Sequence, residues 1–126
     1  MKRILSALLF VVFLAGSAFG LSDSEYLRMR RYSKKFREAD DFLQESYQEC
    51  KDTLPAKDFK QVKAEQIEWV KHGRDEEAGY FFDDEEEGYD PKNRADRIEV
   101  YTKVTEMRAD ALHHICVTYR NEHFTD

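Results

Sequence analysis

The residues of this chain that could carry out chemistry do not stand at the spacings that the chemistry requires. His113 and His114 are adjacent, and neighbouring residues on a helix point about 100° apart, so their imidazoles cannot easily share one metal ion. His72 and His123 have no companion at ligand spacing. The sequence contains neither a Gly-rich phosphate loop nor a Ser nucleophile elbow. It therefore predicts no catalytic residue, no metal site and no cofactor.

A run of five acidic residues stands at 83–87. The run and the glycine after it match the first, third, fifth and sixth places of a calcium-binding EF-hand loop. The twelfth place, which must be a bidentate Glu, is Arg94 instead, so calcium binding is not expected. Because consecutive like charges repel each other, we expect an exposed and mobile loop that could meet a basic partner. The candidate partner-binding residues are Asp83, Asp84, Glu85, Glu86 and Glu87.

Residues 1–20 have the layout of a secretory signal peptide. Two basic residues follow the initial Met, residues 4–14 are almost wholly apolar, and small residues lead up to Gly20. The apolar run is shorter than the roughly 20 residues that a membrane-spanning helix needs. We therefore predict cleavage near Gly20–Leu21, with no lipid anchor because no cysteine stands near that bond. The mature domain, 21–126, is expected in the periplasm or outside the cell, free of the membrane.

The composition favours a helical protein with an acidic surface. The chain has 26 acidic and 20 basic residues, and removing Lys2 and Arg3 with the signal leaves 18 basic residues, a formal net charge of −8. This charge argues against nucleic acid or an anionic lipid surface as a partner and permits a basic protein. With 37% charged residues the core must be thin, which suits long helices with narrow apolar stripes better than sheet folds.

Two prolines, Pro55 and Pro91, divide the mature chain into three segments of helical periodicity. The first runs from Ser22 to Leu54 and the second from Ala56 to about Ala78, with apolar residues recurring at spacings of three, four and seven. A connector at 79–93, which contains the acidic run, precedes the third. The sequence therefore predicts an all-α fold: an antiparallel bundle of three helices, with the acidic loop between the second and the third.

Two details of these helices can be predicted from local residues. We expect any bend in the first helix near Asp40, where the apolar stripe shifts. The third helix is expected to open at Asp90, a capping residue, followed by Pro91 in the first turn.

The chain has two cysteines, Cys50 and Cys116, and an even number in an exported protein favours a disulfide. Each lies near the C-terminal end of its predicted helix, and in an up-down-up bundle the first and third helices run parallel. The two residues can then meet without distortion, so we predict an intramolecular bond. Free thiols or a bond between two chains are the alternatives.

Polar residues interrupt the apolar faces at two places. Gln66 lies three residues before Trp69 on the apolar face of the second segment, and Arg108 lies in the apolar seam of the third. Buried polar groups are normally hydrogen-bonded, so we predict a structural polar pair rather than a binding site.

At these residues the chain resembles the lysozyme inhibitor LprI-like N-terminal domain family, which are small exported bacterial helical domains. The family pattern is roughly D-x-x-L-x-x-x-Y, then Q-x-x-W-x-x-x-R-D, then T-x-x-R-x-x-x-L. This chain has the three elements in order across residues 39–115, with one extra residue between Trp and Arg in the second. The matching residues are Asp40, Leu43, Tyr47, Gln66, Trp69, Arg74, Asp75, Thr105, Arg108 and Leu112.

The chain also departs from the family in its cysteines and its anchor. Family members usually carry cysteines just after the Arg-Asp pair and upstream of the Thr-x-x-Arg element, where this chain has Ala78 and residues 100–101. The family's disulfide scheme therefore does not transfer, and the lipid anchor of the name-giving inhibitor is absent.

The resemblance implies a non-enzymatic envelope protein that binds and inhibits lysozyme. Lysozymes are commonly basic, so an acidic loop would be steered toward the basic rim of the enzyme rather than its acidic cleft. The alternative is an interaction or assembly module for another envelope protein, which would use an exposed helix face. An enzyme acting on the cell wall is disfavoured because the sequence offers neither a nucleophile nor a metal set.

Overall fold

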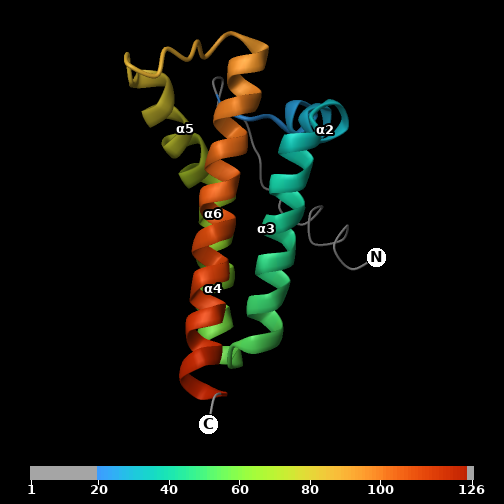
Figure 1. Cartoon of the computed structure of the whole chain (residues 1–126), viewed down its shortest axis with the longest axis vertical. Helices are drawn as coiled ribbons and strands as arrows, with labels where there is room; N and C mark the ends of the chain where they lie inside the picture. Colours follow the sequence, from blue (N-terminus) through green and yellow to red (C-terminus); the bar gives the residue numbers. More distant parts are fainter. Residues whose placement is uncertain (1–19, 125–126) are drawn as a thin grey trace.

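The computed structural model describes residues 20–124, which contain helices and no strand (Figure 1). Nearly all of the expected signal peptide, residues 1–19, lies outside the described residues. The helical elements are α2 (Asp23–Tyr32), α3 (Lys34–Thr53), α4 (Ala56–Glu68), the π-helical turn η1 (Trp69–Gly73), α5 (Arg74–Asp83) and α6 (Arg94–His123). The all-α fold class is thus confirmed, but the number of helices is not.

The described chain has four helices rather than three, because α4, η1 and α5 form one continuous helix and the expected first helix is split in two. The split occurs at Ser33, whose backbone is extended, with φ −114° and ψ 110°. Its N–H donates to the Met29 carbonyl at 2.8 Å, and its Oγ accepts from the Phe36 N–H at 3.1 Å. One serine therefore ends α2 and caps the start of α3. The prediction of a bend near Asp40 was wrong, because Asp40 lies inside the continuous helix α3 and the chain instead turns at Ser33.

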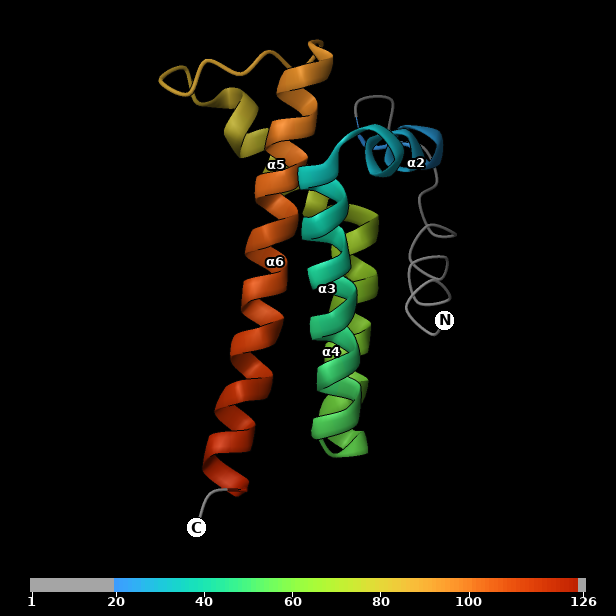
Figure 2. The same cartoon turned by 45° about the vertical axis from the view of Figure 1, so that its right-hand side comes forward.

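The three long helical rods alternate in direction. Figure 1 shows α3 and α6 running the same way side by side, while the continuous helix of α4, η1 and α5 runs in the opposite direction behind α6. Figure 2 shows α2 lying across the top of α3 instead of extending it. The parallel arrangement of the first and third long helices brings the two cysteines to the same end of the bundle.

The loop between the last two helices is shorter than expected. The α5 helix continues through Gly79 and the aromatic residues that follow it to Asp83, so these residues belong to a helix rather than to a connector. The α6 helix begins after Asn93, whose side chain accepts from the Asp96 N–H at 3.0 Å. The expected cap, Asp90, instead accepts from the Lys92 N–H in the loop at 2.8 Å. Asn93 was the better cap because it directly precedes a long stretch without proline.

The core lies between α3 and α6 and extends up to α2 and α5. Its fully buried large side chains include Phe36, Leu43, Tyr101 and Leu112. Of the residues described, no helix is long and apolar enough to cross a membrane. The thin core matches the charged composition, because each helix contributes one narrow apolar face.

Candidate functional site

Three polar residues of the family-like pattern, Asp40, Arg74 and Asp75, lie in one network inside the bundle, and the side chain of Arg74 interacts electrostatically with both carboxylates. Asp40 on α3 is its first centre. This carboxylate is buried, and the Tyr26 hydroxyl and the Arg30 guanidinium both donate to its Oδ2. Arg30 also donates to Asp41 Oδ1 at 2.9 Å. Burial raises the pKa of Asp40, while the hydrogen bonds from Tyr26 and Arg30 favour its ionised form. These contacts fasten α2 onto α3.

Arg74 at the start of α5 is the second centre. Only 3% of this residue is exposed, and its guanidinium carbon lies 5.8 Å from the ring centroid of Tyr26 and 5.6 Å from that of Trp69. Two of its nitrogens, Nε and one terminal nitrogen, have no hydrogen-bond partner. Burial lowers the pKa of the guanidinium. The two aromatic faces supply cation–π attraction that partly offsets the cost of burying this charge.

Asp75, the next residue, is the third centre. Its Oδ1 accepts from the Tyr101 hydroxyl at 2.7 Å and from the backbone N–H of Leu21 at 3.1 Å. Burial, followed by the charge of Asp75, raises the pKa of Tyr101, so the phenol stays protonated and donates. This carboxylate therefore joins the segment before α2 to α5 and α6.

Gln66 and Arg108 meet as a pair below this network. Arg108 Nε donates to Gln66 Oε1 at 2.6 Å, and Gln66 is fully buried. The Gln66 Nε2 and one terminal nitrogen of Arg108 have no partner. Burial lowers the pKa of Arg108. The remaining residues of the pattern, Leu43, Tyr47, Thr105 and Leu112, are buried in the core.

Replacing Arg108 by Met should lower the free energy of unfolding by about 1–3 kcal/mol, because Gln66 Oε1 would lose its donor inside the core. The double variant Arg108→Met with Gln66→Leu should recover most of this loss, since it removes both polar partners. Urea unfolding of the single and double variants measures both effects. A single variant that is as stable as the parent but no longer binds a partner would assign the pair to a binding surface.

Trp69 is held against Arg74 by an unusual helical turn. The Arg74 N–H donates to the Trp69 carbonyl five residues earlier, so η1 is a π turn. In a regular α-helix, residues five apart point about 140° apart, at 100° per residue, and could not share a face. The π turn winds less per residue, so both side chains reach the core, and the Trp69 Nε1–H also donates to Glu77 at 2.6 Å.

Deleting His72, an exposed residue within η1, should convert the π turn into a regular α-helical turn and cost no more than about 1 kcal/mol. Trp69 and Arg74 would then be four residues apart and would still share a face. The matched control deletes Ala64, an exposed residue in the regular helix α4, which rotates the flanking halves against each other. Thermal unfolding followed by circular dichroism compares the melting temperatures of the two deletion variants with that of the parent protein. An equal decrease in both variants would contradict this account of η1.

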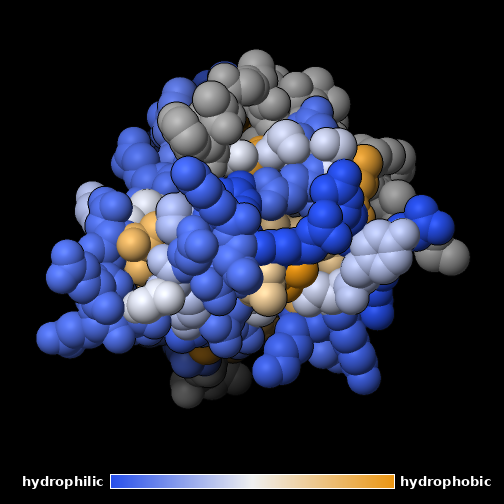
Figure 3. All heavy atoms as spheres, turned by 90° about the horizontal axis from the view of Figure 1, so that it is seen from above, coloured by the Kyte–Doolittle hydropathy of each residue, from blue (hydrophilic) through white to orange (hydrophobic). Residues whose placement is uncertain are grey.

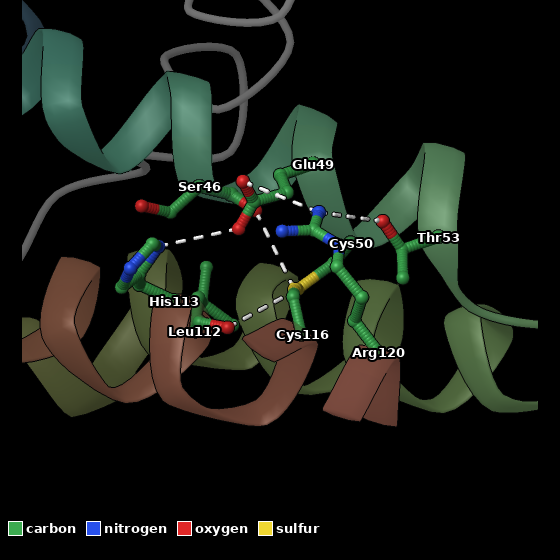
Figure 4. The surroundings of a disulfide bond; sticks show 8 residues. All are labelled: Ser46, Glu49, Cys50, Thr53, Leu112, His113, Cys116 and Arg120. Carbon is green, nitrogen blue, oxygen red and sulfur yellow. Dashed lines mark hydrogen bonds and ion pairs between the residues drawn. A yellow bond between two sulfur atoms is a disulfide. The ribbon is translucent and has the colours of Figure 1, made fainter. Parts of the chain in front are cut away.

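The predicted disulfide between Cys50 and Cys116 is present, with Cα atoms 5.2 Å apart (Figure 4). Both residues are fully buried between α3 and α6. Around it, Glu49 contacts the His113 Nδ1 at 3.2 Å and the Arg120 guanidinium at 3.6 Å. The bond therefore locks the lower half of the two parallel helices together.

Among the described residues, no group of three or more His, Cys, Asp or Glu side chains is arranged so that it could hold a metal ion. His113 faces Glu49 across the α3–α6 interface, and the His72 Nδ1 lies 2.7 Å from Glu68 on the same helix.

The acidic run lies at the opposite end of the bundle from the disulfide. All five of its residues are exposed, and Asp84 organises the turn that follows α5 by accepting from the Glu86 N–H at 3.0 Å. Gly88 ends this turn with a φ of 70°, a conformation that favours glycine. Figure 3 looks onto this end and shows mainly hydrophilic residues, with hydrophobic ones in small separate areas.

A groove of about 450 Å³ runs between α4 and the C-terminal half of α6. Among the described residues, its lining contains apolar side chains, three carboxylates and the polar residues Gln61, His114 and Thr118, but no Lys or Arg. The apolar residues are Leu54, Val62, Ile115 and Tyr119, and the carboxylates are Asp58, Glu65 and Glu122. None of the network residues lines this groove.

The carboxylates of Asp40 and Asp75 accept hydrogen bonds from tyrosine, arginine and backbone donors. Searches of protein-family models, curated proteins and solved structures found no match to this chain. The family-like pattern in the sequence includes Asp40, Arg74 and Asp75, but their partners Tyr26, Arg30 and Tyr101 were not predicted as site residues. The one hint in the sequence was that the two tyrosines, which stand at apolar positions of their helices, carry a hydroxyl group that needs a hydrogen-bond partner when it is buried.

Proposed function

We propose that this chain is an exported, non-enzymatic protein of the LprI-like type that binds a basic protein, with lysozyme as the first candidate. The observation that carries the proposal is the acidic run 83–87, whose five exposed carboxylates form one cluster at the end of the bundle. A cluster of one sign attracts a partner of the opposite sign and accelerates its association. Binding, rather than catalysis, is the activity that such a surface supports.

The arrangement of the family-like residues supports the LprI-like assignment. Asp40 on α3 interacts with Arg74 on α5, next to Asp75, and Gln66 on α4 pairs with Arg108 on α6, so residues far apart in the sequence meet inside the bundle. The extra residue between Trp69 and Arg74 is the main departure from the family spacing. The π turn η1 absorbs this residue, so both side chains still face the core. The disulfide supports export, because such bonds persist in oxidising compartments.

Neutralising the acidic run should slow association with lysozyme at low ionic strength, on the order of tenfold, and have little effect at high salt. The variant carries Asp→Asn and Glu→Gln at all five positions, 83–87. Stopped-flow or surface-based kinetics at two salt concentrations measure the rate, and lysis of cell-wall substrate measures inhibition. An unchanged rate at low salt would remove the run from the binding surface.

A matched control separates this local effect from the loss of net charge. It removes five exposed carboxylates from the sides of helices, away from the acidic run. We expect it to bind lysozyme at nearly the parent rate, because steering depends on where the charges lie. The control substitutions are Glu38→Gln, Glu76→Gln, Glu99→Gln, Glu106→Gln and Asp110→Asn.

The second candidate function is an assembly module, and the groove between α4 and α6 favours it. Its apolar floor and three carboxylates suit a cationic amphipathic segment of another envelope protein. Ile115→Lys should abolish capture of such a partner from an envelope extract without changing the melting temperature. Met107→Lys, at an exposed apolar residue of α6 outside the groove lining, is the control. Equal capture by both variants would argue against the groove.

A further inference from the structure

Leu21, near the start of the described residues, is firmly held in the fold. Its side chain is only 3% exposed and packs in the core, while the next residue, Ser22, caps α2 by accepting from the Glu25 N–H at 3.2 Å. The Leu21 nitrogen lies 3.1 Å from Asp75 Oδ1. The position of this nitrogen is therefore determined on both sides, by a buried side chain and by a helix cap.

We propose that Asp75 is the binding site for a new N-terminus, created when the signal peptide is removed between Gly20 and Leu21. In the uncut chain the Leu21 nitrogen is an amide that donates one neutral hydrogen bond to Asp75. After cleavage the same nitrogen is an α-ammonium group, and the contact becomes an ion pair. This role is independent of any binding to lysozyme.

The step itself is a hydrolysis by a signal-removing peptidase. Water adds across the Gly20–Leu21 peptide bond and the C–N bond breaks. Gly20 leaves as a carboxylate, and the amino group of Leu21 holds the released proton as an ammonium ion. In the folded chain Leu21 is buried and its nitrogen is bonded, so the peptidase acts before the domain folds. Folding then carries the ammonium group to Asp75.

The site suits an ammonium group electrostatically. Arg97 donates to the Gly20 carbonyl at 3.4 Å, but its charge is already balanced by Glu25, which accepts two bonds from it at 2.7 Å. Asp75 Oδ1 accepts from two neutral donors in the uncut chain, the Tyr101 hydroxyl and the Leu21 N–H. An ammonium group in place of that amide would put a positive charge directly at this carboxylate.

The geometry also selects one cleavage position. Successive Cα atoms are about 3.8 Å apart, so each residue retained before Leu21 moves the ammonium group further from its place beside Asp75. The carboxylate is only half-buried, but the surrounding protein still strengthens an ion pair relative to one in bulk water. Capture of a terminal amine is a known recognition mode in proteins.

The test compares two forms of the protein that both contain every described helix. One form is residues 21–126, and the other, residues 18–126, retains Ala18, Phe19 and Gly20. Each is prepared with Asp75 and with Asp75→Asn, which keeps an acceptor oxygen but removes the charge. At pH 6.5, where a free α-amino group is protonated, the 21–126 form should melt higher by about 4–8 °C. Asp75→Asn should abolish this difference.

Equal melting temperatures of the two parent forms, or a difference that survives in Asp75→Asn, would overturn the proposal. If Asp75→Asn does not fold, the reactivity of the N-terminal amine decides the question. The amine of folded 21–126 should react with an amine-selective ester at least about tenfold more slowly than that of 18–126, because the ion pair holds it in place. Equal reactivity would overturn the proposal, as would an exported protein whose mass shows a start other than Leu21.

Discussion

Removing the disulfide should lower the free energy of unfolding by about 4 kcal/mol, the value expected for closing a loop of this length between Cys50 and Cys116. For a domain with so thin a core, that is a large share of the total stability. The Cys50→Ala, Cys116→Ala double variant and the reduced parent protein should both show the loss. Urea unfolding with and without a reducing agent measures it.

The single variants are the controls for this prediction. Each single variant leaves one buried thiol and no disulfide. Both should therefore show the same decrease in the free energy of unfolding as the reduced parent protein, and adding the reductant should not decrease it further. The helical circular dichroism signal at low temperature should persist, because α3 and α6 also share apolar contacts along their length. A parent protein whose urea midpoint is unchanged by reduction would show that the bond adds nothing to stability. It would also weaken the argument for an oxidising compartment.

The general layout of the helices was predictable because it depends on residues that act locally. Pro55 breaks the chain between α3 and α4, and apolar residues at helical spacing mark the buried faces. The position of the disulfide followed from this layout, since two cysteines at the C-terminal ends of parallel helices must lie at one end of the bundle.

The helix boundaries were harder to predict than the layout, because several polar residues near each boundary can act as the N-cap. Ser33 and Asp40 both interrupt the apolar stripe of the first segment, but only Ser33 acts as a cap. Asp40 turns inward instead, where Tyr26 and Arg30 satisfy its charge. Similarly, Asp90 and Asn93 can both cap a helix, and only their position relative to the packed part of α6 decides between them. Such choices depend on tertiary contacts that periodicity does not contain.

The candidate site was predictable in its members but not in its connections. Gln66 and Arg108 were expected to be polar residues within apolar seams, and they lie against each other. No local pattern indicated that Asp75 would contact Leu21, because those residues are brought together only when the segment before α2 packs against α5. Periodicity did not predict the π turn, and its one sign in the sequence was the extra residue between Trp69 and Arg74 relative to the family pattern.

Replacing Trp69 by Ala should cost about 3–5 kcal/mol in the free energy of unfolding, the range for truncating a large buried aromatic residue. Trp69 is 6% exposed, and its ring covers one face of the Arg74 guanidinium. Truncation leaves a cavity and deprives a buried cation of one of its two aromatic contacts. Glu77 would also lose its donor. Urea unfolding followed by far-ultraviolet circular dichroism measures the loss without relying on the tryptophan signal.

Trp69→Phe separates these contributions, because it keeps an aromatic face over Arg74 and removes only part of the ring and the bond to Glu77. Its cost should be clearly smaller, about 1–2 kcal/mol. Gly73 offers a further check, since a Cβ placed there would lie 3.1 Å from Trp69 Cδ1. Gly73→Ala should therefore be more favourable in the Trp69→Ala variant, where the ring is gone, than in the parent protein. If Trp69→Ala left stability unchanged and removed binding to a basic partner, Trp69 would belong to the binding surface and not to the scaffold.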